Sequence, residues 1–166
     1  IRPIPIHVIP HPISVTPSRY WTQDELSNPD GRYTFLFSFS ATSCEARKNP
    51  LGLIQAFKLA FPDSNNEQPL LILKVHHLDM FPKYGEHLRR EVARINGVLI
   101  DKSLSRQEMT DLLASGDCYV SLHRSEGFGL AIAESMALGK PVIATNHSGN
   151  TDFINSNNSF PVDYSL

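Results

Sequence analysis

The densest group of chemically useful residues lies between His123 and Glu134, in the segment HRSEGFGLAIAE. Gly127 and Gly129 have no side chain, so the backbone around them can turn sharply and approach a ligand closely. The apolar residues that follow predict a helix, and the first turn of a helix offers free N–H groups and a positive dipole end to an anion. The segment therefore predicts an anion-binding turn, although two glycines at this spacing also fit a tight turn without a ligand.

Glu134 is distinguished by its neighbours on the predicted helix. All four residues three or four positions away are apolar: Leu130, Ala131, Ala137 and Leu138. The glutamate is therefore expected to be buried, and a buried carboxylate without donors is costly. The hydroxyls of a nucleotide's ribose would be suitable donors here. The alternative is that Glu134 meets only backbone N–H groups near the start of its own helix.

Two cations and a histidine complete the candidate site. Arg47 and Lys48 lie in a predicted loop directly before Asn49–Pro50, a pair typical of a helix start. Cations beside a helix N-terminus can hold phosphate oxygens, but two solvated surface charges are the other interpretation. His123 directly follows a predicted strand, where a lone histidine serves structure as often as chemistry.

Strands and helices alternate along most of the chain. Apolar or alternating runs predict strands at Thr34–Ser40, Leu70–Val75, Val98–Ile100, Cys118–Leu122, Val142–Thr145 and Phe160–Val162. Helical spacing, caps and stop signals predict helices from Asn49–Pro50 onward and at Tyr84–Ile95, Ser105–Gly116, Leu130–Leu138 and Asn150–Ile154. This alternation implies right-handed crossovers and an α/β, Rossmann-like parallel sheet with helices on both faces. Ligands of such sheets bind beyond the carboxyl ends of the strands, in the loops after residues 40, 75, 100, 122 and 145.

Length and composition favour one globular domain. The chain has 166 residues, with 15 Lys and Arg against 17 Asp and Glu, a formal net charge of −2. This balance argues against nucleic acid as a partner, because nucleic-acid-binding domains usually carry a basic excess. Five of the twelve prolines fall in the first 17 residues. Residues 1–18 are therefore predicted to be an extended, linker-like N-terminal segment, and residues 19–166 the domain.

Other features bear on location and metal binding. No apolar run approaches the ~18 residues of a membrane span, no signal-peptide pattern is visible, and Cys44 and Cys118 are too few for a disulfide framework. A cytoplasmic location is expected. His76 and His77 are predicted to point in opposite directions along an extended chain, so they do not suggest a metal pair. The chain begins at Ile1 rather than Met, and we expect it to be part of a longer protein.

Several stretches of the sequence together resemble one protein family. They are VIPHP at 8–12, a strand followed by a basic Lys-Asn-Pro helix start, SLHRSEGFGL at 121–130, and ESMALGKPVIAT at 134–145. This combination resembles the C-terminal, donor-binding domain of retaining GT-B glycosyltransferases, the group 1 enzymes often called family 4. Glu126 and Glu134 match the E-x7-E element of that family, and the flanking GFG and GKPVIAT are more specific than the two glutamates.

The resemblance implies a role for each matching residue. Glu126 would contact hydroxyls of the transferred sugar, Glu134 would take the ribose hydroxyls, and Arg47 and Lys48 would hold the diphosphate. Cations and a helix terminus at that place stabilise the charge that grows on the leaving phosphate. The other residues implied in donor binding are Gly127, Phe128, Gly129 and Leu130, largely through backbone N–H groups, and His123.

The family also implies a mechanism and a substrate. The donor would be a nucleotide-diphosphate sugar, with its base near residues 99–104. Transfer would retain the anomeric configuration, by front-face displacement, with no bound metal and no cofactor. Three departures affect single assignments: Ser43 stands where many members have an arginine, so Arg47 would substitute; His76 and His77 replace glycines; and Asp152 replaces a glutamate.

Family members bind their acceptor on an N-terminal domain that this sequence lacks. We therefore expect the chain to bind a donor but to transfer little sugar alone. Through the other domain the protein would meet a sugar or lipid-linked acceptor, in glycan or polysaccharide biosynthesis, with the full-length protein peripheral to a membrane as an open option. Two other functions stay open: a nucleotide-sugar epimerase of related fold, which fits the GFG and E-x7-E stretch less well, and a non-catalytic nucleotide-binding module, against which Arg47, Lys48, Glu126 and Glu134 speak.

Overall fold

The fold is an α/β arrangement of one parallel sheet with helices on both faces. The computed structural model describes residues 7, 9–62 and 68–165. The sheet contains β1 (Thr34–Ser40), β2 (Leu70–His76), β3 (Val98–Asp101), β4 (Cys118–Ser121), β5 (Val142–Thr145) and β6 (Phe160–Val162), in the order β3-β2-β1-β4-β5-β6. All neighbouring strands pair in parallel. The Rossmann-like fold predicted from the sequence is confirmed.

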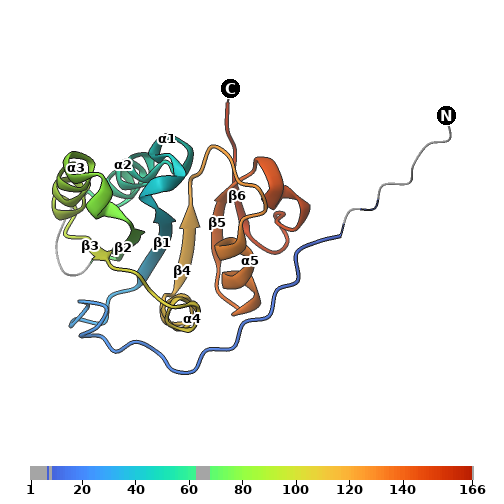
Figure 1. Ribbon diagram of the computed structural model, residues 1–166, viewed down its shortest axis with the longest axis horizontal. Helices are drawn as coiled ribbons and strands as arrows, with labels where there is room; N and C mark the ends of the chain where they lie inside the picture. Colours follow the sequence, from blue (N-terminus) through green and yellow to red (C-terminus); the bar gives the residue numbers. More distant parts are fainter. Residues whose placement is uncertain (1–6, 8, 63–67, 166) are drawn as a thin grey trace.

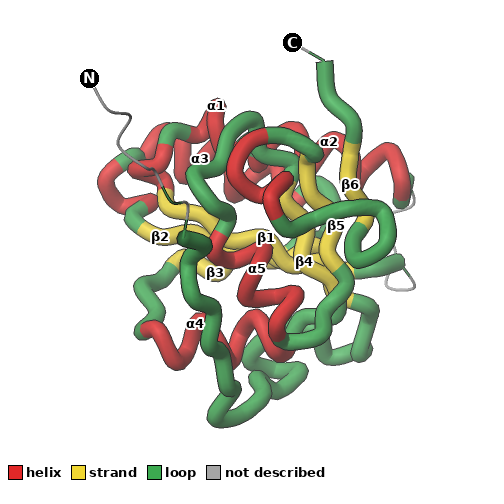
Figure 2. The backbone as a smooth tube through the Cα atoms, turned by 90° about the vertical axis from the view of Figure 1, so that its right-hand side faces the viewer, coloured by secondary structure: helices red, strands yellow, loops and turns green. Residues whose placement is uncertain are grey.

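The helices divide between the two faces of this sheet (Figures 1 and 2). One face carries α2 (Pro50–Ala60) and α3 (Pro82–Ala93), and the other carries α4 (Arg106–Ser115) and α5 (Leu130–Ala137). A short α1 (Glu45–Lys48) and the 3-10 turns η1 (Ala41–Ser43), η2 (Leu78–Met80) and η3 (Ser148–Asp152) lie in the connections. No helix of the described residues is long and apolar enough to cross a bilayer.

The alternation in β1 decides which face becomes polar. Phe35 packs against Phe57 of α2 and against Phe61 directly after that helix, so the phenylalanines of TFLFSFS face α2. Ser38 and Ser40 lie on the opposite face, because neighbouring residues of a strand point to opposite sides. The α4–α5 face of the sheet is therefore polar near the carboxyl end of β1.

Several helix boundaries follow the sequence signals closely. The capping box of α4 is formed: the Glu108 amide donates to Ser105 Oγ at 3.2 Å, and the Ser105 amide donates to Glu108 Oε2 at 2.7 Å. Helix α3 begins two residues earlier than predicted, at Pro82, since proline is favoured in the first helical position. The helix predicted at Asn150–Ile154 is the 3-10 turn η3.

The connection from β1 to α2 differs from its prediction. Arg47 and Lys48 belong to the one-turn helix α1 rather than to a loop. Asn49 separates the two helices in the left-handed conformation (φ 54°) and does not cap α2 with its side chain. Instead, Asn49 Nδ2 donates to the Leu122 carbonyl at 2.8 Å, so this asparagine ties the loop after β1 to the loop after β4.

The N-terminal segment runs across the α4–α5 face (Figure 1). No strand occurs in its described part, residue 7 and residues 9–18; residues 1–6 and 8 lie outside the described residues. Ser18 fixes the segment to α4, because its amide and its hydroxyl donate to the Asp111 carboxylate at 2.7 and 2.8 Å. Gln107 adds a bond from Nε2 to the Thr16 carbonyl at 3.1 Å.

Candidate functional site

A cleft of about 350 Å³ lies on the α4–α5 face, beside β1, β4 and the start of α5. The loops after β1 and β4 meet there, as expected for a parallel sheet whose ligands bind beyond the carboxyl ends of its strands. Its lining comes from the N-terminal segment, both strands, α1, the loop after β4 and the start of α5: His11, Ser38, Lys48, Tyr119, Glu126, Phe128, Gly129, Leu130, Ala131 and Ile132.

Glu126 joins the two loops through both predicted cations. Lys48 Nζ donates to Glu126 Oε1, and Arg47 Nη1 lies 3.4 Å from Glu126 Oε2. The side chains of Lys48 and Glu126 are only 15% and 12% exposed, so solvent screens this pair weakly. Arg47 is held further by bonds to the carbonyls of Ser43 at 3.1 Å and Ser125 at 2.9 Å. The structure thus brings Arg47, Lys48 and Glu126 into one charged cluster.

The start of α5 offers unsatisfied donors to the same cleft. Gly129 precedes the helix with φ +90°, a conformation that disfavours any side chain, and no side chain caps the helix there. The Ala133 amide donates to the Gly129 carbonyl at 3.0 Å, which is the first hydrogen bond of the helix. Residues 130–132 line the cleft, and their amides lie in the first turn of α5, where an amide has no intrahelical partner. The start of α5 therefore has a free first turn where the sequence predicts one, and anion binding there stays a prediction.

The turn is supported by two residues after β5 that were not singled out from the sequence. Ser148 Oγ accepts from the Glu126 amide at 2.7 Å, and the Gly149 amide donates to the Glu126 carbonyl at 3.1 Å. A Cβ on Gly149 would lie 1.8 Å from the Gly127 carbonyl oxygen. Only glycine therefore fits at 149. The only indication of this role in the sequence was the position of Gly149, in a loop at the functional edge of the sheet.

Glu134 is buried as predicted, with a side chain 3% exposed. Its partner is Arg106 at the start of α4, whose Nη2 lies 2.6 Å from Glu134 Oε1. The contact is an ion pair without hydrogen-bond geometry, so Oε1 is a buried oxygen with no hydrogen-bond partner. The alternative of backbone donors in its own helix is not observed. Arg106 was missed because nothing local marks an arginine in the first turn of a helix as the partner of a residue 28 positions away.

His123 is not among the residues that line the cleft. It is 1% exposed, and its ring lies between Ser121 and the loop after β5. Nε2 is within 3.2 Å of the His147 carbonyl and 3.0 Å of Asn150 Oδ1. Since both are acceptors, Nε2 carries the proton and Nδ1 accepts from Ser121 Oγ at 3.0 Å. The ring is fully engaged inside the protein, and its contact with a donor stays a prediction.

Tyr119 and Ser38 contribute polar groups to the cleft. Tyr119 Oη lies 3.2 Å from Ser38 Oγ and 3.4 Å from the Ser38 carbonyl. Burial raises the pKa of the Tyr119 phenol, the bonds to Ser38 oppose this, and the carboxylates of Glu126 and Glu134 raise it further. The phenol is therefore a neutral hydrogen-bonding group, and both glutamates act electrostatically on the same part of the sheet.

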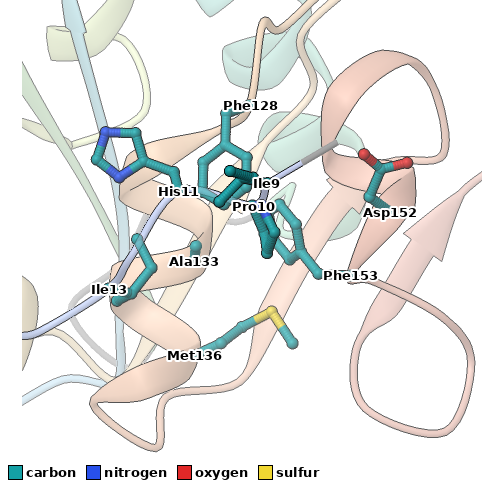
Figure 3. A pocket seen from close by; sticks show the side chains of 9 residues that line it. All are labelled: Ile9, Pro10, His11, Ile13, Phe128, Ala133, Met136, Asp152 and Phe153. Atoms are coloured by element: carbon teal, nitrogen blue, oxygen red, sulfur yellow. The ribbon is translucent and has the colours of Figure 1, made fainter. Parts of the chain in front are cut away.

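A larger, mostly apolar cavity of about 680 Å³ adjoins the cleft (Figure 3). It lies between the N-terminal segment and α5, with Phe128 and His11 lining both spaces. Their ring centroids are 5.7 Å apart, and Phe128 also contacts Phe153 at 5.0 Å. Asp152 lines this cavity (Figure 3) and is not among the residues that line the cleft.

The two adjacent histidines after β2 correct one expectation. His76 and His77 do not point in opposite directions; their rings stack with centroids 3.5 Å apart. The reason is the backbone, because His77 takes the left-handed conformation (φ 64°) and leaves the extended path. Burial lowers the pKa of His76, with smaller effects from His77 and Lys74.

Fold and site together define a Rossmann-like α/β domain whose cleft, at the carboxyl edge of the sheet, contains cationic side chains and the start of a helix. The sequence pattern of the glycosyl transferases group 1 family matches residues 23–162. The chain therefore belongs to the glycosyl transferases group 1 family, which confirms the resemblance seen in the sequence.

Several solved structures share this fold. HepE from Anabaena, crystallised with UDP and glucose, has a TM-score of 0.68 at 20% identity, over 85% of this chain and 37% of its own. A glycosyltransferase from Rickettsia africae has a TM-score of 0.69 at 21% identity, and the match covers 85% of this chain and 36% of that protein. A UDP-forming α,α-trehalose-phosphate synthase from Burkholderia xenovorans has a TM-score of 0.69 at 14% identity, and the match covers 86% of this chain and 36% of that protein. The chain spans little more than a third of the length of these proteins.

Proposed function

We propose that this chain is the donor-binding domain of a retaining, metal-independent glycosyltransferase that takes a sugar from a nucleotide-diphosphate sugar. The observation that carries the proposal is the meeting of Lys48, Glu126 and the uncapped start of α5 in one cleft. HepE from Anabaena, which has a similar fold, was crystallised with UDP and glucose and with UDP-glucose, and this supports a nucleotide sugar as the ligand class.

In the proposed complex the diphosphate lies at the start of α5. The free amides of residues 130–132 and the Lys48 ammonium donate to its oxygens. Lys48 has three N–H donors, so it can keep Glu126 while it receives a phosphate. Negative charge grows on this diphosphate as the glycosidic bond breaks, so these donors stabilise the transition state more than the ground state.

Glu126 and Glu134 hold the two carbohydrate parts of the donor. Glu126, oriented by Lys48 and Arg47, accepts from hydroxyls of the transferred sugar. Glu134, on α5, accepts from the ribose, and the base lies toward residues 99–104 between β3 and α4. Positive charge from Lys48 and Arg47 replaces a metal ion at the leaving group. In the whole protein a second domain would supply the acceptor, a sugar or a lipid-linked glycan.

A ligand screen tests the donor assignment directly. The chain is melted with UDP, GDP and ADP and with their glucose or mannose conjugates, each at about 100 times its dissociation constant. A true ligand adds ~2.7 kcal/mol of stability at that concentration, which shifts the melting temperature by about 5–10 °C for a chain of this size. We expect one nucleotide and its sugars to give this shift. If no nucleotide shifts the melting temperature, the proposal is refuted.

Retention and the need for a second domain require a separate measurement. We expect the chain alone to transfer little or no sugar to added acceptors, although it binds the donor. The whole protein should yield a product whose anomeric proton coupling, measured by NMR, matches that of the donor. Inverted product would contradict the retaining mechanism, and rapid transfer by the isolated chain would contradict the two-domain proposal.

A further inference from the structure

The ion pair between Arg106 and Glu134 differs from the other pairs on this face. Glu134 is 3% exposed, whereas the Arg106 side chain is 64% exposed. In the described part of the chain, the guanidinium has no other ion pair or hydrogen bond. A guanidinium carries five N–H donors, and here its contact with Glu134 involves one nitrogen. Most of its hydrogen-bonding capacity therefore faces outward, while the carboxylate that it neutralises lies inside.

The position of Glu134 places this pair beside the cleft. Side chains of a helix lean toward its N-terminus, over the residues three and four positions earlier. For Glu134 these are Ala131 and Leu130, and both line the cleft. Oε1 is fully buried against Arg106 without a hydrogen bond, which leaves Oε2 as the oxygen on the more accessible side. Arg106 therefore occupies one oxygen of the carboxylate and leaves the other for a ligand.

We propose that Arg106 is a positioning residue of the donor site: it holds Oε1 of Glu134 so that Oε2 accepts from the ribose hydroxyls. This inference rests on the proposed function. Arginine is always protonated, so it supplies a permanent counter-charge before a donor arrives. Without it, Glu134 would be a buried carboxylate with no counter-ion, a costly arrangement. The carboxylate would turn away or bind a proton, and the ribose would lose its acceptor. Helix α4 thus takes part in the site through one side chain.

The test compares two nucleotides on four proteins by isothermal titration calorimetry. The nucleotides are UDP and its 2′,3′-dideoxy analogue, replaced by the GDP or ADP pair if the ligand screen selects another base. The proteins are the unchanged chain, Arg106→Gln, Arg106→Lys and Arg94→Gln. Arg94 is the matched control, because it is 65% exposed and also paired with a glutamate, Glu91 on α3.

We expect the unchanged chain to bind the ribonucleotide at least about tenfold more tightly than the dideoxy analogue, as for a hydrogen bond to a charged group. Arg106→Gln should weaken the ribonucleotide about tenfold and leave the dideoxy analogue within twofold. Arg106→Lys should recover part of the loss, and Arg94→Gln should bind as the unchanged chain does. Melting curves measured by circular dichroism check that each variant folds. If Arg106→Gln does not fold, Arg106→Lys must show the selective effect instead, with affinity for the ribonucleotide about threefold weaker and affinity for the dideoxy analogue unchanged.

The outcomes separate this inference from the proposed function. Equal weakening of both nucleotides by Arg106→Gln would show a general structural role and overturn the inference. Arg106→Gln would also overturn it by binding the ribonucleotide as tightly as the unchanged chain does, with the preference over the dideoxy analogue intact. If the unchanged chain binds none of the nucleotides, the proposed function itself fails and the inference fails with it.

Discussion

Two pairs of carboxylates in this domain are satisfied in different ways. Asp117 accepts from the Thr34 amide at 2.7 Å and its hydroxyl at 2.8 Å, which ties the start of β4 to the start of β1. Asp111 on α4 accepts from Ser18, Arg19 and Gln107. In contrast, Glu126 and Glu134 have ion pairs with cations, and Glu134 Oε1 has no hydrogen bond at all.

The difference indicates which carboxylates are structural and which are available to a ligand. Backbone amides and hydroxyls from neighbouring segments meet Asp111 and Asp117, so these residues fasten parts of the chain to one another. The glutamates meet long, charged side chains that can shift and keep spare N–H donors. A buried acceptor left unsatisfied is uncommon in a folded protein and calls for an explanation. At Glu134 the unsatisfied atom, Oε1, faces the charge of Arg106, and we propose that this arrangement keeps the other oxygen, Oε2, for a ligand.

The largest expected effect comes from removing Lys48. Lys48→Met deletes a donor to the proposed diphosphate and leaves Glu126 with Arg47 alone at 3.4 Å. A hydrogen bond between charged groups contributes ~1.5–3 kcal/mol, so the dissociation constant for the nucleotide selected in the screen should rise about 10- to 100-fold. Calorimetry measures it, with Lys58→Met on the exposed side of α2 as the control. Equal affinity in the two variants would place the phosphates elsewhere.

A substitution at Gly149 tests whether the turn after Glu126 depends on close packing against the loop after β5. In Gly149→Ala the new Cβ would meet the Gly127 carbonyl at 1.8 Å, so the backbone after Glu126 must move. Such overpacking costs ~1–3 kcal/mol, or about 2–12 °C in melting temperature, and nucleotide affinity should fall as well. Gly127→Ala is the control for stability, because its Cβ would meet nothing within 4 Å. A Gly149→Ala protein as stable as Gly127→Ala would show that the loops are not tightly packed.

Local signals were sufficient to predict most of the sheet and the capping box of α4. The phenylalanine alternation of β1, the apolar run of β2 and the Ser105–Glu108 pair each act within a few residues, so the sequence shows them directly. The one-turn helix α1 was missed because four residues are too few to show helical periodicity. Asn49 precedes α2 as the Asn49–Pro50 pair predicts, but its side chain does not cap the helix, because it donates to the Leu122 carbonyl in a loop 73 positions away.

The site could be predicted only in its local parts. Glu126 and Gly129 stand in one short motif, and Arg47 and Lys48 adjoin a recognisable helix start. Their meeting follows from the parallel topology, which brings the ends of β1 and β4 to one edge. The Arg106–Glu134 pair and the fit of Gly149 against Gly127 follow from side-chain packing between separate elements, which no spacing in the sequence encodes.

The smallest effect is expected at Asp111, and it sharpens the contrast because it should leave binding unchanged. Desolvation raises the pKa of Asp111, but hydrogen bonds from Gln107, Ser18 and Arg19 outweigh it and lower the pKa from 3.8 to about 2. The ionised form is therefore favoured by folding. Its contribution to stability is complete above the ordinary pKa and is lost as pH falls through about 2.

Asp111→Asn should thus melt a few degrees below the unchanged chain at pH 7. The gap between their melting temperatures should stay constant down to about pH 5 and shrink from pH 4 to pH 2. Asp30→Asn, in an exposed turn, is the control, and at pH 7 it should melt at the same temperature as the unchanged chain. The affinity of Asp111→Asn for the nucleotide should match that of the unchanged chain, because its carboxylate fastens the N-terminal segment to α4 rather than facing the cleft. A weaker affinity would mean that the position of this segment, and of His11 within it, is itself part of the donor site.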